Sequence, residues 1–228
     1  MEISKDTVEI LRNFATINPN IVFNQGNLIK SVKPGQAALA KAYVSENFPQ
    51  TFGIYDLNEF LLALTMFGQE SVRLSFHDNH VVIADSSGLY RTSYYFIDPE
   101  LVASSTTDKE VVMPKCQLKF SLDKRTLNYI RKSSSGFGLD YLVVSPKGNN
   151  LVELKVTELK KQKDKEEFGN AFVCEVPAEF ESDDFRFTFL VSNFKMIDGD
   201  YDVEVSNSYI SHFTNKEQPI EYWVATER

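Results

Sequence analysis

Apolar residues at helical spacing mark the beginning of the chain. Residues 4–15 (SKDTVEILRNFA) carry them at intervals of three and four, the spacing of one face of an amphipathic helix. Ser4 directly precedes this pattern, and a serine there is a favourable N-cap. Residues 55–67 (YDLNEFLLALTMF) predict a second helix, with Asp56 or Asn58 as its cap.

Alternating apolar and polar residues predict strands between and after these helices. Residues 71–97 alternate like paired strands, with turns at Asp78-Asn79 and at Ser86-Ser87-Gly88. Residues 98–115 are polar, contain two prolines, and predict a linker that ends in the apolar patch Val111, Val112 and Met113.

The second half of the chain starts a similar series. Residues 120–132 (FSLDKRTLNYIRK) predict a serine-capped helix, and residues 139–159 predict a hairpin that turns at residues 146–149. Strands at residues 170–176 and at the end of the chain flank residues 186–213, which predict a strand, a short helix, a turn and a strand. The mixed-charge run at residues 160–167 (KKQKDKEE) is typical of a solvated loop.

The two halves share a pattern that indicates an internal repeat. Ile3-Ser4-x-Asp6 aligns with Phe120-Ser121-x-Asp123 at an offset of 117 residues, and each half carries helices and strands in the same order. We therefore expect a duplicated α+β chain with domains at 1–108 and 109–228, joined by a connector at about 98–115. Chance similarity of two amphipathic helices is the alternative.

Composition narrows the class of protein. The 228 residues include 24 Lys and Arg against 32 Asp and Glu, a net charge of −8, which argues against simple electrostatic coating of nucleic acid. Only two cysteines occur, Cys116 and Cys174, which suits a reducing compartment and inert packing. The polar N-terminus predicts no signal peptide, and the longest apolar run is too short for a membrane span, so we expect a soluble intracellular protein.

Positive charge is nevertheless gathered on the predicted helices. Lys124, Arg125, Arg131 and Lys132 fall within nine residues, and the first predicted helix carries Lys5 and Arg12. A basic helical face on an acidic chain would contact phosphates without reading bases, and weakly enough to slide. Ordinary solvated surface is the alternative for each of these side chains.

Catalytic and metal-binding patterns are weak in this sequence. His77 and His80 share a predicted hairpin with Asp78, but they lack further ligands at suitable spacing, so surface histidines explain them better than a metal site. His212 is the third histidine, and G-x-S-x-G, Walker A and G-x-G-x-x-G strings do not occur. We expect no enzyme, no cofactor and no metal.

Several strings resemble one protein family, the DNA polymerase sliding clamps of T4-like bacteriophages. They are ISKDTVEILRNFATIN at residues 3–18, IYDLNEFLLAL at 54–64, VVIAD at 81–85, DPELV at 98–102 and NFKMIDGDYDV at 193–203. The first string is the most specific, and the similarity is weakest over residues 104–190.

The resemblance implies two similar processivity-fold (DNA clamp) domains, with helices packed on antiparallel sheets. It implies a homotrimeric ring that encircles double-stranded DNA without sequence specificity and tethers the replicative polymerase. An ATP-driven clamp loader would load the ring, late-transcription proteins would be further partners, and the location would be the cytoplasm of a phage-infected bacterium. A two-domain acidic interaction protein that never encircles DNA is the alternative, and a hydrolase with scattered carboxylates is a weaker one.

The resemblance also assigns residues to surfaces. The DNA-facing set is Lys5, Arg12, Lys124, Arg125, Arg131, Lys132 and Lys195. The pocket for a partner peptide would involve Val111, Val112, Met113, Tyr222, Trp223 and Val224, for which ordinary sheet core is the alternative. The subunit interface would pair strand 91–97 with strand 170–176, and would include Tyr94, Tyr95, Phe172 and Cys174.

Overall fold

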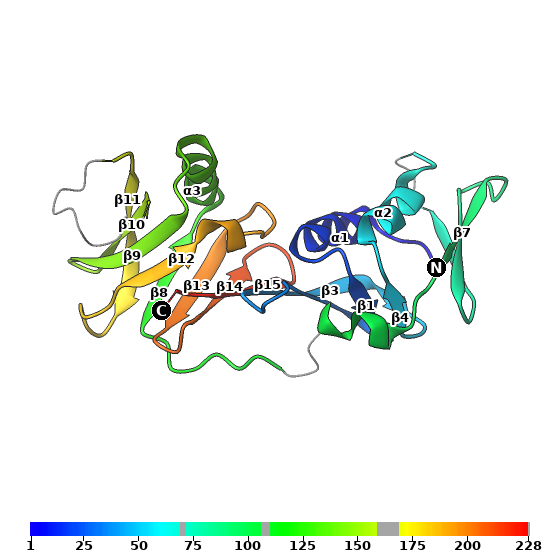
Figure 1. The fold of residues 1–228 in the computed structure, drawn as a ribbon, viewed down its shortest axis with the longest axis horizontal. Coiled ribbons are helices and arrows are strands. Elements are labelled where there is room, and N and C mark those ends of the chain that lie inside the picture. Colours follow the sequence, from blue (N-terminus) through cyan, green and yellow to red (C-terminus); the bar gives the residue numbers. More distant parts are fainter. Residues whose placement is uncertain (69–71, 106–109, 159–168, 228) are drawn as a thin grey trace. The chain divides into compact units, whose positions relative to one another are not determined.

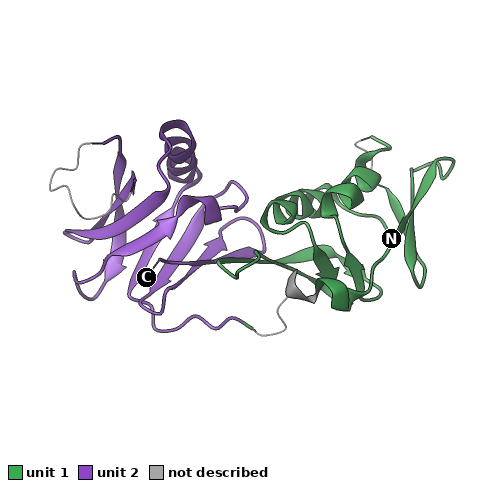
Figure 2. Cartoon of the chain, viewed as in Figure 1, with its two compact units in different colours: residues 1–110 green, residues 111–228 purple. Residues whose placement is uncertain are grey.

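The structure, a computed structural model, describes residues 1–68, 72–105, 110–158 and 169–227 (Figure 1). The chain divides into two compact units, Met1–Glu110 and Val111–Arg228 (Figure 2). The predicted loop at residues 160–167 lies outside the described residues. Within the described part, no helix combines the length and the apolar character needed to cross a membrane.

Unit 1 places two helices beside each other over antiparallel strands. The helices are α1 (Lys5–Ile17) and α2 (Leu57–Thr65), and a 3-10 helix, η1 (Pro99–Ser105), follows the strands. The strands are β1 (Ile21–Phe23), β2 (Gly26–Val32), β3 (Ala38–Phe48), β4 (Phe52–Ile54), β5 (Arg73–Phe76), β6 (His80–Ala84) and β7 (Arg91–Tyr95). β1 pairs with β4, β2 pairs with β3, and β5, β6 and β7 form a three-stranded sheet.

Aromatic packing builds the core of unit 1. The Phe23 ring stacks on Phe52 at a centroid distance of 4.7 Å, and Phe52 stacks on Phe96 at 4.5 Å. Phe60 of α2 meets Phe23 edge-on at 6.1 Å, which anchors the helix to the strands beneath it. Such pairs contribute about 0.5–1.5 kcal/mol each beyond the area that they bury.

The predicted linker begins as part of unit 1. Val102 of η1 is buried, and a Cβ at Gly53 would lie 2.8 Å from the carbonyl oxygen of Ile97 and 3.1 Å from Val102. Only glycine fits where the chain passes so closely over β4. The prediction of a free linker from residue 98 onward is therefore wrong for η1.

Unit 2 contains one long helix and eight antiparallel strands among its described residues. The helix is α3 (Lys124–Phe137), and a single 3-10 turn, η2 (Val191–Asn193), packs beside it. The strands are β8 (Leu118–Leu122), β9 (Tyr141–Gly148), β10 (Leu151–Thr157), β11 (Phe172–Phe180), β12 (Phe187–Leu190), β13 (Tyr201–Ser206), β14 (Ile210–Asn215) and β15 (Ile220–Ala225). Their order in the sheet is β12-β9-β10-β11-β8-β13-β14-β15.

The serine cap predicted for the helix in unit 2 is wrong. The cap of α3 is Asp123, whose Oδ1 accepts the Thr126 N–H at 2.6 Å, while Ser121 belongs to strand β8. The short helix expected within residues 186–213 is present as η2, a 3-10 helix of three residues. An isolated helix of that length has too few internal hydrogen bonds to offset nucleation, so packing decides its form.

The topology supports duplication but changes the register of the repeat. The N-caps Ser4 and Asp123 are 119 residues apart, not 117, and this offset aligns Lys5 with Lys124 and Arg12 with Arg131. The β1–β4 and β2–β3 pairs correspond to β9–β12 and β10–β11, and β5-β6-β7 corresponds to β13-β14-β15. The two units are thus versions of one domain, with η2 at the place of α2.

Candidate nucleic-acid interface

Helix α3 carries the largest basic surface that the sequence predicted. Its residues Lys124–Phe137 include four basic side chains and no acidic one. Lys124, Arg125 and Lys132 are exposed, whereas Arg131 is partly buried. The buried face consists of Leu127, Ile130 and Ser133, so the amphipathic spacing turns most of the positive charge toward solvent.

The N-terminus of α3 is occupied by carboxylates of the chain itself. Asp123 caps the Thr126 N–H, and the Lys124 N–H donates to Asp200 Oδ1 at 2.7 Å. The Thr126 N–H lowers the pKa of Asp123, because this hydrogen bond favours the charged carboxylate. An anion at α3 would therefore be held by side chains and not by the helix terminus.

Arg125 is oriented by an aromatic neighbour one helical turn away. Its Nε donates to the Tyr129 hydroxyl at 3.1 Å, and its guanidinium lies 5.4 Å from the Tyr129 ring centroid. Tyr129 in turn contacts Phe172 of β11, with the ring centroids 6.0 Å apart. These contacts hold the cation on the helix surface while leaving it exposed.

Arg131 differs from the other cations of α3, because the chain's own loop uses its guanidinium. Nε donates to the carbonyl of Phe194 at 3.1 Å, and Nη2 donates to the carbonyl of Met196 at 2.5 Å. Nη1 forms an ion pair with Asp198 at 2.7 Å. The sequence placed Arg131 among DNA-facing residues, whereas the structure gives its donors to residues 194–198.

Residues 194–198, which accept the hydrogen bonds of Arg131, include one basic residue, Lys195. Lys195 is exposed between the buried residues Phe194 and Met196. The Tyr222 hydroxyl accepts the Ile197 N–H at 3.0 Å, and the Tyr201 hydroxyl donates to the Ile197 carbonyl at 2.5 Å. The backbone on both sides of Lys195 is thus tied to α3, β13 and β15.

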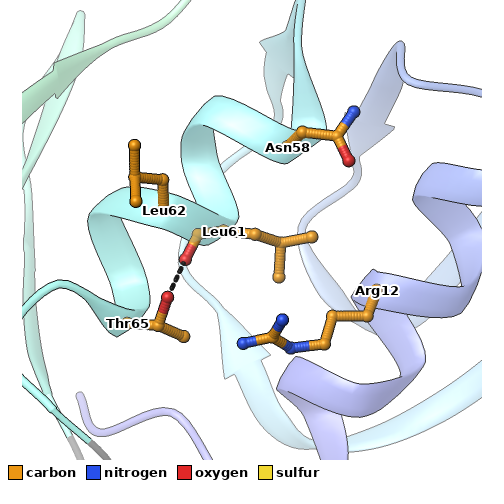
Figure 3. Close-up of a pocket in the computed structure, with 5 residues that line it drawn as sticks. All are labelled: Arg12, Asn58, Leu61, Leu62 and Thr65. Atoms are coloured by element: carbon orange, nitrogen blue, oxygen red, sulfur yellow. Dashed lines mark hydrogen bonds between the residues drawn. The ribbon is translucent and has the colours of Figure 1, made fainter.

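Helix α1 of unit 1 has a mixed surface. Lys5 and Arg12 are exposed as expected, but Asp6 and Glu9 are exposed on the same helix. Figure 3 shows the Arg12 side chain crossing from α1 toward α2, into a pocket of about 410 Å³. Asn58, Leu61, Leu62 and Thr65 line the side of this pocket that belongs to α2. The positive charge of α1 is therefore balanced.

A buried carboxylate at the N-terminus of α1 was missed from the sequence. Glu46 of β3 accepts the Ser4 N–H through Oε1 at 2.5 Å and the Thr7 hydroxyl through Oε2. Burial alone would raise the pKa of Glu46, but these hydrogen bonds outweigh it and lower the pKa. The signal was present, because Ala42, Val44, Glu46 and Phe48 alternate on the buried face of β3.

The residues predicted for a peptide pocket do not share one surface. Tyr222 and Val224 are core residues on the face where Tyr222 meets Ile197. Trp223 faces the opposite side and stacks on His212 at a centroid distance of 4.5 Å. Val112 is 78 % exposed, between the half-buried Val111 and Met113 in the segment before β8. Because neighbouring strand residues alternate in direction, Trp223 is separated from its two neighbours.

The predicted interface strands differ in what they expose. On β7, Tyr94 turns inward, where its hydroxyl donates to the Asp56 carbonyl at 3.3 Å and its ring meets Phe60. Tyr95 is exposed on the same strand. On β11, Phe172 and Cys174 are half-buried, and burial raises the pKa of the Cys174 thiol. Among the described residues, β7 is the edge strand of its sheet, and β11 pairs with β8 only at Ala178–Phe180.

In the hairpin of β5 and β6, the rings of His77 and His80 stack on each other and are not arranged to bind a metal ion together. The His77 and His80 rings lie 4.5 Å apart with an interplanar angle of 7°, and His80 also stacks on Tyr95. Across the described residues, no group of three or more His, Cys, Asp or Glu side chains is placed to hold a metal ion.

Comparison with solved structures identifies the fold. The proliferating cellular nuclear antigen of Entamoeba histolytica matches with a TM-score of 0.69 at 13% identity, over 97% of this chain and 95% of that chain. At this identity the likeness shows the fold alone. The predicted clamp fold, α+β with two similar domains, is confirmed.

Sequence comparisons are more specific. Residues 4–89 match the family model described as DNA polymerase processivity factor. The chain is 28% identical to the sliding clamp of Vibrio phage KVP40, over 100% of this chain and 99% of the relative. It is 26% identical to the sliding clamp of Escherichia phage RB69, over 89% and 86%. The resemblance to the sliding clamps of T4-like phages is confirmed.

Proposed function

We propose that this chain is a sliding clamp, a DNA polymerase processivity factor that forms a ring around duplex DNA. The single observation that carries the DNA contact is helix α3, which exposes Lys124, Arg125 and Lys132 with no carboxylate among its residues, in a chain of net charge −8. Lys195 belongs to the same proposed surface of unit 2, and Lys5 and Arg12 are the DNA contacts that we propose on unit 1. The matches to processivity factors support this assignment.

A ring needs little affinity for the duplex that it encloses. Encirclement raises the local concentration of a tethered polymerase at the primer end, without any tight contact. A few exposed cations per subunit contact phosphates independently of base sequence. An acidic chain with a small basic face thus favours sliding over static binding. This role is non-catalytic.

Three copies would close the ring through strand edges. β7 is an edge strand of its sheet. β11 pairs with β8 only at Ala178–Phe180. Within the described residues, residues 172–177 of β11 therefore have no pairing with β8. Pairing of β7 in one subunit with β11 in the next would satisfy both edges and repeat head to tail. The exposed Tyr95 and the half-buried Phe172 and Cys174 would flank this junction.

Partner proteins would dock on unit 2 with short apolar peptides. The exposed Val112, with Val111 and Met113, supplies apolar surface before β8. Trp223 is buried, but it lies on the opposite face of β15 from Tyr222 and Val224, where it stacks on His212. The replicative polymerase and an ATP-driven clamp loader are the partners that we propose first. Late-transcription proteins are further partners, and the cytoplasm of the infected bacterium is the location.

Two measurements test this function. Sedimentation equilibrium should give three times the chain mass of 26.0 kDa, and a strict monomer at high concentration would contradict ring formation. On primed circular DNA, with the polymerase and loader of the same phage, the protein should lengthen the products made per binding event. Truncation of the polymerase's C-terminal tail should abolish this effect. A chain that binds the polymerase but leaves product lengths unchanged would instead be a two-domain interaction protein.

A further inference from the structure

Arg131 and Lys195 are linked through the backbone of one loop. The two carbonyls that accept from the Arg131 guanidinium belong to Phe194 and Met196, the residues on either side of Lys195. The Lys195 N–H itself donates to the Asn193 carbonyl at 2.9 Å. By holding the backbone on both sides of Lys195, the Arg131 guanidinium fixes the direction in which the Lys195 side chain points.

The corresponding arginine of unit 1 shows why this link exists only in unit 2. Arg12 and Arg131 each stand eight residues after the N-cap of their helix (Ser4 and Asp123). Arg12 faces α2, a helix whose carbonyls are mostly satisfied by its own hydrogen bonds (Figure 3). At the place of α2, unit 2 has the single turn η2, which leaves the carbonyls after it in need of donors.

The geometry leaves Arg131 poorly suited to hold a phosphate. Each of its three nitrogens already donates to the chain, and Asp198 neutralises its charge. The Arg131 side chain is 23 % exposed, whereas Lys195 is exposed. Three of the five guanidinium N–H groups of Arg131 donate to the chain, so a phosphate could meet only the remaining two, on a cation whose charge Asp198 already balances.

We propose that Arg131 is a positioning residue that acts on DNA through Lys195, and that Lys195, not Arg131, contacts the phosphate. This inference rests on the proposed function, because it assigns the contact within the same DNA-facing surface. Arg131 supplies a rigid fork that matches two carbonyls and one carboxylate. A lysine at this position would keep the charge but would lose that fork.

The test is a double-variant cycle read through salt dependence. Affinity for a fluorescent linear duplex of mixed sequence is measured over a range of NaCl concentrations for wild type, Lys195→Ala, Arg131→Lys and the double variant. Each phosphate contact contributes about 0.9 to the slope of log affinity against log salt. Lys195→Ala and Arg131→Lys should each make the slope less steep by this same amount per subunit. The double variant should make it no less steep than either single variant.

A matched control separates positioning from direct contact. Lys124→Ala combined with Arg131→Lys should reduce the steepness of the slope additively, because the Lys124 side chain stands on α3 itself and not on the 194–198 loop that Arg131 holds. If Arg131→Lys leaves the slope unchanged, or adds to Lys195→Ala, the proposal is wrong. A wild-type protein without salt-dependent duplex binding would overturn this inference, whereas the length of the processive products tests the proposed function separately.

Hydrogen exchange tests the positioning step without DNA. Arg131→Lys should speed exchange of the Ile197 amide, which the Tyr222 hydroxyl now protects, while the amides of strand β10 stay unchanged. Asp198→Asn keeps both carbonyl contacts of Arg131 and should have a smaller effect. Unchanged exchange at Ile197 in Arg131→Lys would refute the positioning role, even if DNA binding were normal.

Discussion

Helices α1 and α3 occupy the same place in the two units, yet their surfaces differ. Both begin at a cap whose side chain accepts the N–H of a threonine three residues on, Thr7 or Thr126. α1 carries two basic and two acidic residues, for a net charge of zero, whereas α3 carries four basic residues and no acidic ones. The two units share one scaffold, but the basic helix that we propose for DNA contact lies in unit 2.

The element beside each helix explains a second difference. α2 is a regular helix of nine residues, and η2 is a turn of three. The arginine at this position therefore faces a regular helix in unit 1. In unit 2 it donates to the backbone carbonyls that follow η2. One residue type thus serves as an exposed cation at Arg12 and as a structural clamp at Arg131.

The largest expected effect concerns the charges of α3. Replacing Lys124, Arg125 and Lys132 together by Ala should lower the salt slope of duplex binding by about 0.9 for each phosphate that these residues contact, and should shorten processive products. The matched variant on α1, Lys5→Ala with Arg12→Ala, should lower the slope less, because α1 is already neutral overall. Fluorescence anisotropy over a salt series measures both. Equal losses from the two helices would refute the asymmetry.

The second prediction compares the two corresponding arginines. Arg131→Ala removes a charged donor from two carbonyls and one carboxylate, and should reduce the free energy of unfolding by about 2–3 kcal/mol. Arg12→Ala removes an exposed side chain and should change it by less than about 0.5 kcal/mol. Urea denaturation of both variants gives the comparison. A costly Arg12→Ala would show that the pocket beside α2 depends on its arginine.

The third prediction concerns acid sensitivity in unit 1. Because the folded-state pKa of Glu46 is lowered, its contribution to stability is complete above the ordinary value of 4.5 and is lost as the pH falls through the folded value. Glu46→Gln should cost about 1–2 kcal/mol at neutral pH, and this difference should shrink toward zero in acid. Thermal unfolding at a series of pH values measures it.

An exposed carboxylate on the same helix provides the control for Glu46. Glu9→Gln should change the free energy of unfolding at neutral pH by less than about 0.5 kcal/mol, since Glu9 is exposed on α1. If the cost of Glu46→Gln were the same at every pH, the charged form of Glu46 would not be what stabilises the helix.

The smallest expected effect lies at the end of α3, where two glycines have opposite roles. Gly138 is the C-cap with φ +67, and Gly138→Ala should destabilise unit 2 by about 1 kcal/mol, because a Cβ is strained in this left-handed conformation. Gly136 lies within the helix with open space around its Cα, so Gly136→Ala should stabilise it by about 0.5–1 kcal/mol. Melting temperatures should move in opposite directions, and a shift of the same sign would contradict the assigned helix end.

Much of the fold and part of the candidate site followed from local pattern. The spacing of apolar residues located α1 and α2, and Ser4 and Asp56 were recognised as possible caps. The concentration of lysine and arginine on α3 was visible because helix periodicity is a property of adjacent residues. The resemblance to phage sliding clamps was visible in short strings such as residues 3–18. It implied both the fold and a polymerase as partner.

Tertiary structure decided what those residues do. Whether a basic side chain on α3 is exposed or clamped depends on a loop more than sixty residues away, so Arg131 could not be told from Lys132 by spacing. Glu46 and Asp200 reach the starts of α1 and α3 from distant segments. Sequence periodicity reports which face of an element is apolar, but hydrogen bonds between remote segments form only when the folded chain brings donors and acceptors within about 3 Å of each other.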